Sequence, residues 1–297
     1  MSDRPLVSFD WALKHLLRDK ANFGVLEGVL SALLDDRITV QSVLESESNR
    51  DSETAKYNRV DLLVENGLGE LCIIELQYDY ESNYFARLLF GASRCIVDHL
   101  GIGDDYSKVR KVISISILYF LFGEGEDDYV YHGTMEFYGR HSHNKLVLKQ
   151  HKLAALHDVY IPPPNSNIFP EYYLIEVERF TDLIREPLDE WIYFFKYAEI
   201  KPEFTAPGML EAREKLDYVK LDEPKKQAYR RYREDLASER DVISTARREG
   251  EANGLEEGRE EERKDIAHNL LRKGLSVEMI AEVTGLSIAA IDALKLL

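Results

Sequence analysis

Residues 59–77 read RVDLLVENGLGELCIIELQ, and this stretch has the pattern of a β-hairpin. Apolar segments at 59–64 and 71–77 flank residues 66–69, NGLG, which are of the types that turns favour. Strand side chains alternate between two faces, so Glu75 and Gln77 project from the same face. The hairpin therefore predicts that two carboxylates, Asp61 and Glu75, converge with the amide of Gln77 at one end.

The register of this hairpin decides how close the two acids lie. A loop formed by all of residues 66–69 pairs Glu65 with Glu70 and places Asp61 opposite Ile74, next to Glu75. A bulge or a slip of one residue places Asp61 directly opposite Glu75. The sequence leaves both registers open.

The segments around the hairpin predict an α/β fold. Helical spacing of apolar residues occurs in the segments 8–36, 81–100 and 187–199. Strand patterns occur in 109–122, 129–148 and 172–180, and residues 38–47 fit a strand or a loop. Residues 109–122 are a long apolar run rich in β-branched residues, which is typical of a buried strand.

The composition changes after Pro207. Residues 208–264 are charge-dense and helical in character, and residues 266–297 predict short helices with N-caps at Ser276 and Ser287 and C-caps at Gly274 and Gly285. We therefore divide the chain into a domain at 1–206 and a charged helical linker with a helical assembly module at 207–297. Because so short a module cannot bury its apolar faces alone, we expect it to pack on the core or on a second copy, which favours a homodimer.

Composition and charge limit the binding partners and the cellular compartment that the sequence predicts. The chain of 297 residues is 44% hydrophobic and carries a net charge of −16, which counts against general electrostatic attraction to nucleic acid. The sequence has no signal-peptide pattern and no apolar run near the roughly 20 residues that cross a bilayer. The two cysteines, Cys72 and Cys95, lie in apolar stretches and are expected to be buried thiols. We expect a cytoplasmic protein without a membrane segment.

Carboxylates at the end of the hairpin fit a metal site. Carboxylate oxygens suit Mg²⁺, which accepts phosphate oxygens and can assist attack of water on phosphorus. The alternative is that Asp61 and Glu75 are solvated acids of a surface hairpin. Their position in two strongly apolar strands favours the site, because unpaired acids are costly to bury. The histidines at 132, 141, 143, 151 and 157 match no zinc spacing and are interpreted as loop and surface residues.

Six short segments together resemble the recombination-promoting nuclease and transposase family of the PD-(D/E)XK superfamily. They are DWALK at 10–14, RVDL at 59–62, IELQ at 74–77, FAR at 85–87, LIEVERF at 174–180 and WIYFF at 191–195. The resemblance implies a restriction-endonuclease-like core, in which helices flank a mixed central sheet. It also implies Mg²⁺-dependent endonucleolytic cleavage of DNA, linked to recombination, mobile-element activity or phage defence.

Carried over by position, the resemblance assigns metal binding to Asp61 and Glu75. Gln77 stands where the wider superfamily has Lys, and a neutral amide can only hydrogen-bond the attacking water. Two further groups are weaker candidates: Asp10, Lys14 and Arg87 for supporting the site or contacting phosphate, and Glu27 for a further metal ligand. Asp10 and Lys14 are four residues apart, so an ordinary ion pair within one helix is the alternative for them.

A second function class is a nuclease-like fold with little or no turnover that binds DNA or protein. Residues 275–288 resemble half of a helix-turn-helix, yet Lys295 is the only basic residue in 288–297. The terminal helices are therefore interpreted as an assembly element rather than a base reader. The resemblance also implies a separately made C-terminal fragment, with Met209 as a candidate start, that restrains the nuclease.

Overall fold

The computed structural model describes residues 6–44, 61–124, 128–146 and 167–294. The chain divides into two compact units, Met1–Lys226 and Gln227–Leu297, and each is described by itself. Among the described residues, no helix is both long and apolar enough to cross a membrane.

The first unit is built on a mixed six-stranded sheet with the order β1-β2-β3-β4-β6-β5. Its strands are β1 (Val40–Leu44), β2 (Leu62–Asn66), β3 (Leu71–Gln77), β4 (Val112–Leu118), β5 (Val130–Gly133) and β6 (Glu171–Glu176). The first three strands pair antiparallel, β3, β4 and β6 pair parallel, and β5 closes the edge antiparallel to β6. The predicted mixed α/β sheet is confirmed, and β4 is buried along its whole length, as its apolar run predicted.

The β2–β3 turn settles the register that the sequence left open. Leu62 pairs with Ile74, and the backbone N–H of Asn66 donates to the carbonyl of Glu70 at 3.0 Å. The turn is therefore one residue shorter than a loop of all four residues 66–69, and Gly69 adopts the left-handed φ of 78° that such a turn needs. Of the two registers that the sequence left open, the one that pairs Glu65 with Glu70 is not observed, because Glu65 pairs with Leu71. The slipped register, with Asp61 opposite Glu75, is the one observed.

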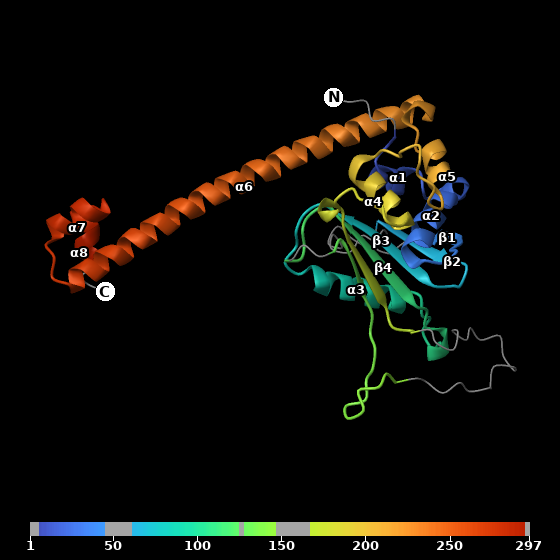
Figure 1. Ribbon diagram of the computed structural model, residues 1–297, viewed down its shortest axis with the longest axis horizontal. Coiled ribbons are helices and arrows are strands. Elements are labelled where there is room, and N and C mark those ends of the chain that lie inside the picture. The colour runs from blue at the N-terminus through green and yellow to red at the C-terminus, as the bar shows by residue number, and fades with distance from the viewer. Residues whose placement is uncertain (1–5, 45–60, 125–127, 147–166, 295–297) are drawn as a thin grey trace. The chain divides into compact units, whose positions relative to one another are not determined.

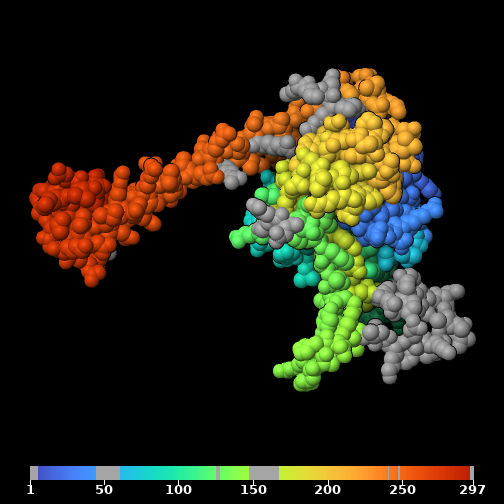
Figure 2. Space-filling view, in the orientation of Figure 1, coloured from blue at the N-terminus to red at the C-terminus, as the bar shows by residue number. Residues whose placement is uncertain are grey.

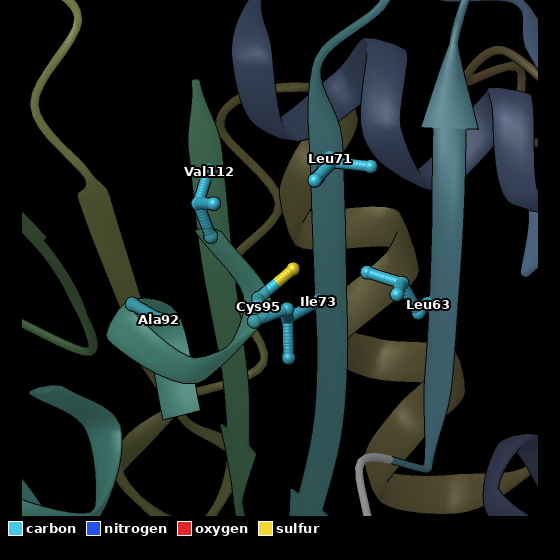
Figure 3. Close-up of a cluster of buried hydrophobic side chains, with 6 residues drawn as sticks. All are labelled: Leu63, Leu71, Ile73, Ala92, Cys95 and Val112. Atoms are coloured by element: carbon cyan, nitrogen blue, oxygen red, sulfur yellow. The ribbon is translucent and has the colours of Figure 1, made fainter. Parts of the chain in front are cut away.

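Helices cover both faces of the sheet (Figure 1). The helices α1 (Phe9–His15), α2 (Phe23–Leu34), α4 (Pro187–Tyr197) and α5 (Met209–Lys215) lie on one face, and α3 (Tyr84–Asp98) lies on the other. The first face is packed with large rings: Phe9 contacts Trp191, Phe194 and Phe195. Under α3 a cluster of buried apolar residues consists of Leu63, Leu71, Ile73, Ala92, Cys95 and Val112 (Figure 3). Cys72 and Cys95 are buried free thiols, as predicted.

An arm projects from this body. Residues 134–146 follow β5 and form the light green extension in Figure 2. Tyr138 and Lys145 make an isolated antiparallel bridge across the arm, so the further strand structure predicted within 129–148 amounts to β5 and this bridge in the described residues.

Pro207 and Gly208 pack closely on α2 and α4 within the first unit. A Cβ atom added to Gly28 of α2 would lie 2.4 Å from the carbonyl oxygen of Pro207, so only glycine fits at this crossing. Gly208 has a left-handed φ of 77°, and Trp191 donates its indole N–H to the Pro207 carbonyl at 3.1 Å. Although the composition changes at Pro207, the division between the two compact units falls after Lys226.

The second unit contains most of α6 (Glu223–Arg272), then α7 (Val277–Thr284) and α8 (Ile288–Leu294). The predicted caps are confirmed: Ser276 and Ser287 accept backbone N–H groups of the following helices, and Gly274 and Gly285 have positive φ. The short helices bury their apolar faces on each other and on the end of α6, in a cluster centred on Ala267, Ile280 and Ile291. They therefore bury part of their apolar residues in a small core within the second unit.

Candidate active site

The site is built on the edge of the hairpin where Asp61 leads into β2. The pairing of Leu62 with Ile74 places Asp61 across from Glu75. The Asp61 carboxylate, through Oδ2, accepts the backbone N–H of Leu76 at 2.8 Å. Local pairing of two apolar strands thus brings together two acids that are fourteen residues apart in the sequence.

Glu75 is the acid of this pair whose charged form is disfavoured by its surroundings. Its side chain is 12% exposed, and burial raises the pKa of its carboxyl to about 7. The nearby guanidinium of Arg87 opposes the shift, whereas the negative charges of Asp61 and Glu81 add to it. A carboxylate that is both desolvated and next to another acid gains the most from a cation.

Cations from two helices face the acids. From α1, the Lys14 ammonium lies 3.7 Å from Asp61 Oδ1. Just beyond α1, Arg18 donates to the backbone carbonyl of Asp61 at 2.7 Å. From α3, Arg87 lies 4.0 Å from the carboxylate of Glu75. The structure therefore brings Lys14 and Arg87, two of the weaker sequence candidates, to the predicted acids.

Gln77 takes part in a network on the other side of Glu75. Its amide N–H group donates to Glu81 at 3.0 Å and to the carbonyl of Asp79 at 3.1 Å. Its carbonyl oxygen accepts from Arg87 at 3.3 Å, and Arg87 also binds Glu81 at 2.7 Å. Sequence reasoning missed Glu81, since a single acid in a loop of a chain with 54 acids gives no signal.

Asp10 does not form the ion pair with Lys14 that was the alternative interpretation of these two residues. It is fully buried, and its carboxylate accepts the hydroxyl of Tyr78 at 2.5 Å. Tyr78 immediately follows β3 and stacks on Tyr119, which immediately follows β4, with ring centroids 4.5 Å apart. Asp10 therefore anchors the chain at the end of the strand that carries Glu75 and Gln77. Tyr78 was also missed from the sequence.

Glu27 lies away from the acid pair. Its carboxylate accepts the backbone N–H of Val40 at 2.9 Å, and Val40 pairs with Asn66, the end of β2 opposite to Asp61. The structure thus gives Glu27 a place at the start of β1 and does not group it with Asp61 and Glu75.

Asp61 and Glu75 fit a Mg²⁺ ion by their chemistry. Within the described part of the chain, no three acidic, histidine or cysteine side chains gather as a ligand group. Mg²⁺ commonly binds through one or two carboxylates and keeps several waters, so two acids are a sufficient protein contribution. The raised pKa of Glu75 beside Asp61 is the electrostatic condition that a divalent cation would relieve.

Comparison with known families agrees with this geometry. Residues 7–246 match the family model described as PD-(D/E)XK nuclease family transposase, and the chain belongs to that family. Residues 260–296 match a second model, described as the Rpn/YhgA-like nuclease family C-terminal HTH domain. A search of curated proteins and a search of solved structures found no match.

The second match changes the interpretation of the terminal helices. The partial helix-turn-helix resemblance of residues 275–288 extends to a match over 260–296, the segment that contains α7, α8 and the end of α6. A helix-turn-helix is a DNA-binding motif, so the preference for a purely structural role is not supported.

Proposed function

We propose that the first unit is a Mg²⁺-dependent DNA endonuclease whose active site is formed by Asp61, Glu75 and Gln77. The observation that carries the proposal is the position of Asp61 across from Glu75, with the pKa of Glu75 raised to about 7. Membership in a PD-(D/E)XK nuclease family supports the same reaction class, hydrolysis of a phosphodiester.

Each residue of the site has a distinct task in this proposal. Asp61 and Glu75 would hold the Mg²⁺ ion, which when bound neutralises charge that develops on the phosphate. Lys14 is 44% exposed and can leave Asp61 to contact a phosphate oxygen. It would supply the positive charge that Gln77, a neutral side chain, lacks.

Gln77 and Arg87 would position the attacking water and the acid beside it. The Gln77 amide can hydrogen-bond a water but cannot add charge to it. Arg87 lies near Glu75 and contacts both Gln77 and Glu81, so it holds these side chains in one arrangement. Asp10 supports the same end of β3 through Tyr78.

The second unit is proposed to deliver the nuclease to DNA and to assemble it. Its match to an HTH domain supports DNA as the partner. Met279, Val283 and Ile288 are more than half exposed on α7 and α8, which favours a homodimer through this unit. A separately made C-terminal fragment would occupy the same surface and restrain the full-length nuclease. Recombination, mobile-element movement and phage defence are the processes that fit a nuclease of this family, acting in the cytoplasm.

A second candidate function is a DNA- or protein-binding module with little turnover. The observation that favours it is the engagement of Gln77, whose amide already binds Glu81 and Arg87. In that case the family fold would be retained without an efficient means of activating water.

Plasmid cleavage separates the two functions. Supercoiled plasmid is incubated with the purified full-length chain in Mg²⁺ or in EDTA, and nicked and linear products are measured. We expect products only in Mg²⁺, and we expect Asp61→Ala and Glu75→Ala each to abolish them while the circular dichroism spectrum stays unchanged. Full cleavage by both variants would show that the active site lies elsewhere. Absence of cleavage by the unsubstituted chain, with DNA binding intact, would favour the binding module.

A further inference from the structure

An aromatic cluster lies where the central strands β3 and β4 end, at the end of the sheet that carries Glu75. It consists of five rings from the ends of β3 and β4 and the start of α3: Tyr80, Tyr84, Phe85, Phe120 and Phe122. Neighbouring rings in this cluster have centroids between 5.0 and 6.5 Å apart. Such spacing is typical of rings in contact, so the cluster is one packed group.

The cluster begins next to the acid pair. The Arg87 guanidinium, which lies 4.0 Å from Glu75, is 6.0 Å from the centroid of the Tyr84 ring. Tyr84 is fully buried and contacts Phe122, which in turn contacts Tyr80 and Phe85. A continuous path of side chains thus connects the active-site acid with two rings at the surface.

Those two rings are largely exposed to solvent, although they belong to the packed cluster. Tyr80 is 61% exposed and Phe85 is 64% exposed. Single exposed apolar residues are common on proteins, but two exposed rings that both pack on Phe122 form a surface that a ligand can contact. On the other side of Phe85, a cavity of about 340 Å³ opens between α3 and the strands β5 and β6, with Leu89, Tyr131 and Tyr172 in its walls.

Because the protein is negatively charged, DNA binding by this unit requires a contribution other than the attraction of phosphates. The net charge is −16, and Lys14 and Arg87, the cations beside the acids, are engaged with acidic side chains. Attraction of phosphates is therefore limited, since it depends on clustered cations and Lys14 must first leave Asp61 to take part. Stacking of a base on an aromatic ring contributes about 1–3 kcal/mol per base and needs no positive charge.

We propose that Tyr80 and Phe85 form a base-stacking subsite for unpaired nucleobases next to the scissile phosphate. The substrate of the first unit is then DNA with single-stranded or unpaired bases at the cleavage point, because bases inside a duplex do not offer their faces to protein rings. This inference rests on the proposed nuclease function for the location of the scissile phosphate. The subsite itself is defined by binding.

Binding is measured by fluorescence anisotropy with the full-length chain in EDTA, so that no cleavage occurs. Three probes of equal length are used: an oligothymidylate, the same strand with abasic spacers at its central positions, and a duplex. The abasic strand keeps every phosphate and loses only bases, so it isolates stacking from charge. The variants are Tyr80→Leu and Phe85→Leu, with Tyr80→Phe and Phe85→Tyr as conservative partners.

Tyr106→Leu is the matched control. Tyr106 is 85% exposed and lies just before β4, at the end of that strand away from the cluster. We expect the unsubstituted chain to bind oligothymidylate about tenfold more tightly than the abasic strand, which corresponds to roughly 1.4 kcal/mol. Each leucine variant should lose about fivefold or more on oligothymidylate and little on the duplex, whereas the conservative variants and Tyr106→Leu keep the preference.

Two results would overturn the subsite. One is equal affinity of the unsubstituted chain for the normal and the abasic strand. The other is a leucine variant that keeps the preference but changes the oligomeric state, since the rings would then be a contact between protein chains.

The same variants separate this inference from the nuclease proposal. Metal-dependent cleavage that is lost in Asp61→Ala, without any preference for unpaired bases, leaves the nuclease standing and removes the subsite. A base preference that depends on Tyr80 and Phe85, without any cleavage in Mg²⁺, supports the subsite and removes the nuclease.

Discussion

The carboxylate of Asp61 is tied by a 2.8 Å hydrogen bond to the backbone N–H of Leu76, the residue directly after Glu75. The acid of one strand is thereby fixed to the backbone of the strand that carries the other acid. This hydrogen bond holds the Asp61 carboxylate at the end of the hairpin where Glu75 lies. A site held by strand pairing is better ordered than one held by loops, which is a requirement for positioning a metal ion and a phosphate.

The first prediction concerns Lys14. Lys14→Gln should lower the plasmid cleavage rate by about 10²-fold, because it removes a charge placed to meet the phosphate. Its melting temperature should stay near that of the unsubstituted chain, since Lys14 is 44% exposed. Lys108→Gln is the matched control, because Lys108 pairs with Asp104 on the segment before β4. If both variants cleave at the same rate, Lys14 has no part in the reaction.

The second prediction concerns Gln77. Gln77→Lys should keep activity, because an ammonium group at this position can still donate to Glu81 and adds a charge near the water. Gln77→Leu should lose at least about tenfold in single-turnover rate, since it can make no hydrogen bond. Thermal melting of both variants checks that the loss is not caused by unfolding. Equal rates for Gln77→Leu and the unsubstituted chain would show that the amide is only structural.

The third prediction is that Glu75 destabilises the metal-free fold. Burial raises the folded pKa of Glu75 from 4.5 to about 7, so the folded state binds the proton more tightly than the unfolded state. Its stabilising effect is fully present below pH 4.5 and is lost as the pH rises through about 7. In EDTA at pH 8, Glu75→Gln should therefore melt a few degrees higher, on the order of 2–4 °C per kcal/mol.

Two comparisons control this measurement. At a pH below 4.5 the difference between Glu75→Gln and the unsubstituted chain should disappear, because both side chains are then neutral. Added Mg²⁺ at pH 8 should raise the melting temperature of the unsubstituted chain more than that of Glu75→Gln. A variant that melts lower than the unsubstituted chain at pH 8 would contradict the electrostatic origin of the effect.

The fourth prediction concerns assembly and restraint by the C-terminal part. The fragment 227–297 should be folded and dimeric by light scattering, and it should slow plasmid cleavage when added in excess to the full-length chain. Met279→Lys together with Val283→Lys should abolish both effects by placing charges on the exposed face of α7. The fragment 209–297 is compared in parallel, since Met209 is buried in the first unit. Monomeric fragments without effect on cleavage would remove both ideas.

Much of the sheet could be predicted from the sequence, because strands such as β4 consist of apolar runs that are typical of buried strands. The hairpin register could not. It depends on Gly69 taking a left-handed conformation and on the Asn66 side chain, which accepts the backbone N–H groups of Leu68 and Glu70. Several turns are compatible with NGLG, and only three-dimensional packing of both strand faces selects one.

In the site, too, contacts within the hairpin could be predicted from the sequence, whereas contacts between distant segments could not. The hairpin pattern alone predicts that Asp61 and Glu75 converge at one end, in either register. The contact of Tyr78 with Asp10 joins residues 68 apart in the sequence, and its existence depends on how α1 packs on the sheet. A helix pattern predicts that Asp10 and Lys14 share a face, but it does not predict that Asp10 is fully buried while Lys14 reaches Asp61.

The close crossing of Gly28 and Pro207 has a consequence for how such a nuclease can be recombined with other modules. Pro207 covers α2 and accepts the Trp191 indole N–H, so a chain cut after Ala206 leaves an open groove and an unsatisfied buried donor. A boundary at which evolution or an engineer could exchange the C-terminal unit therefore lies after Lys226, at the division between the two compact units within α6. A fusion made there would keep the first unit whole and, with it, the hairpin that carries Asp61 and Glu75.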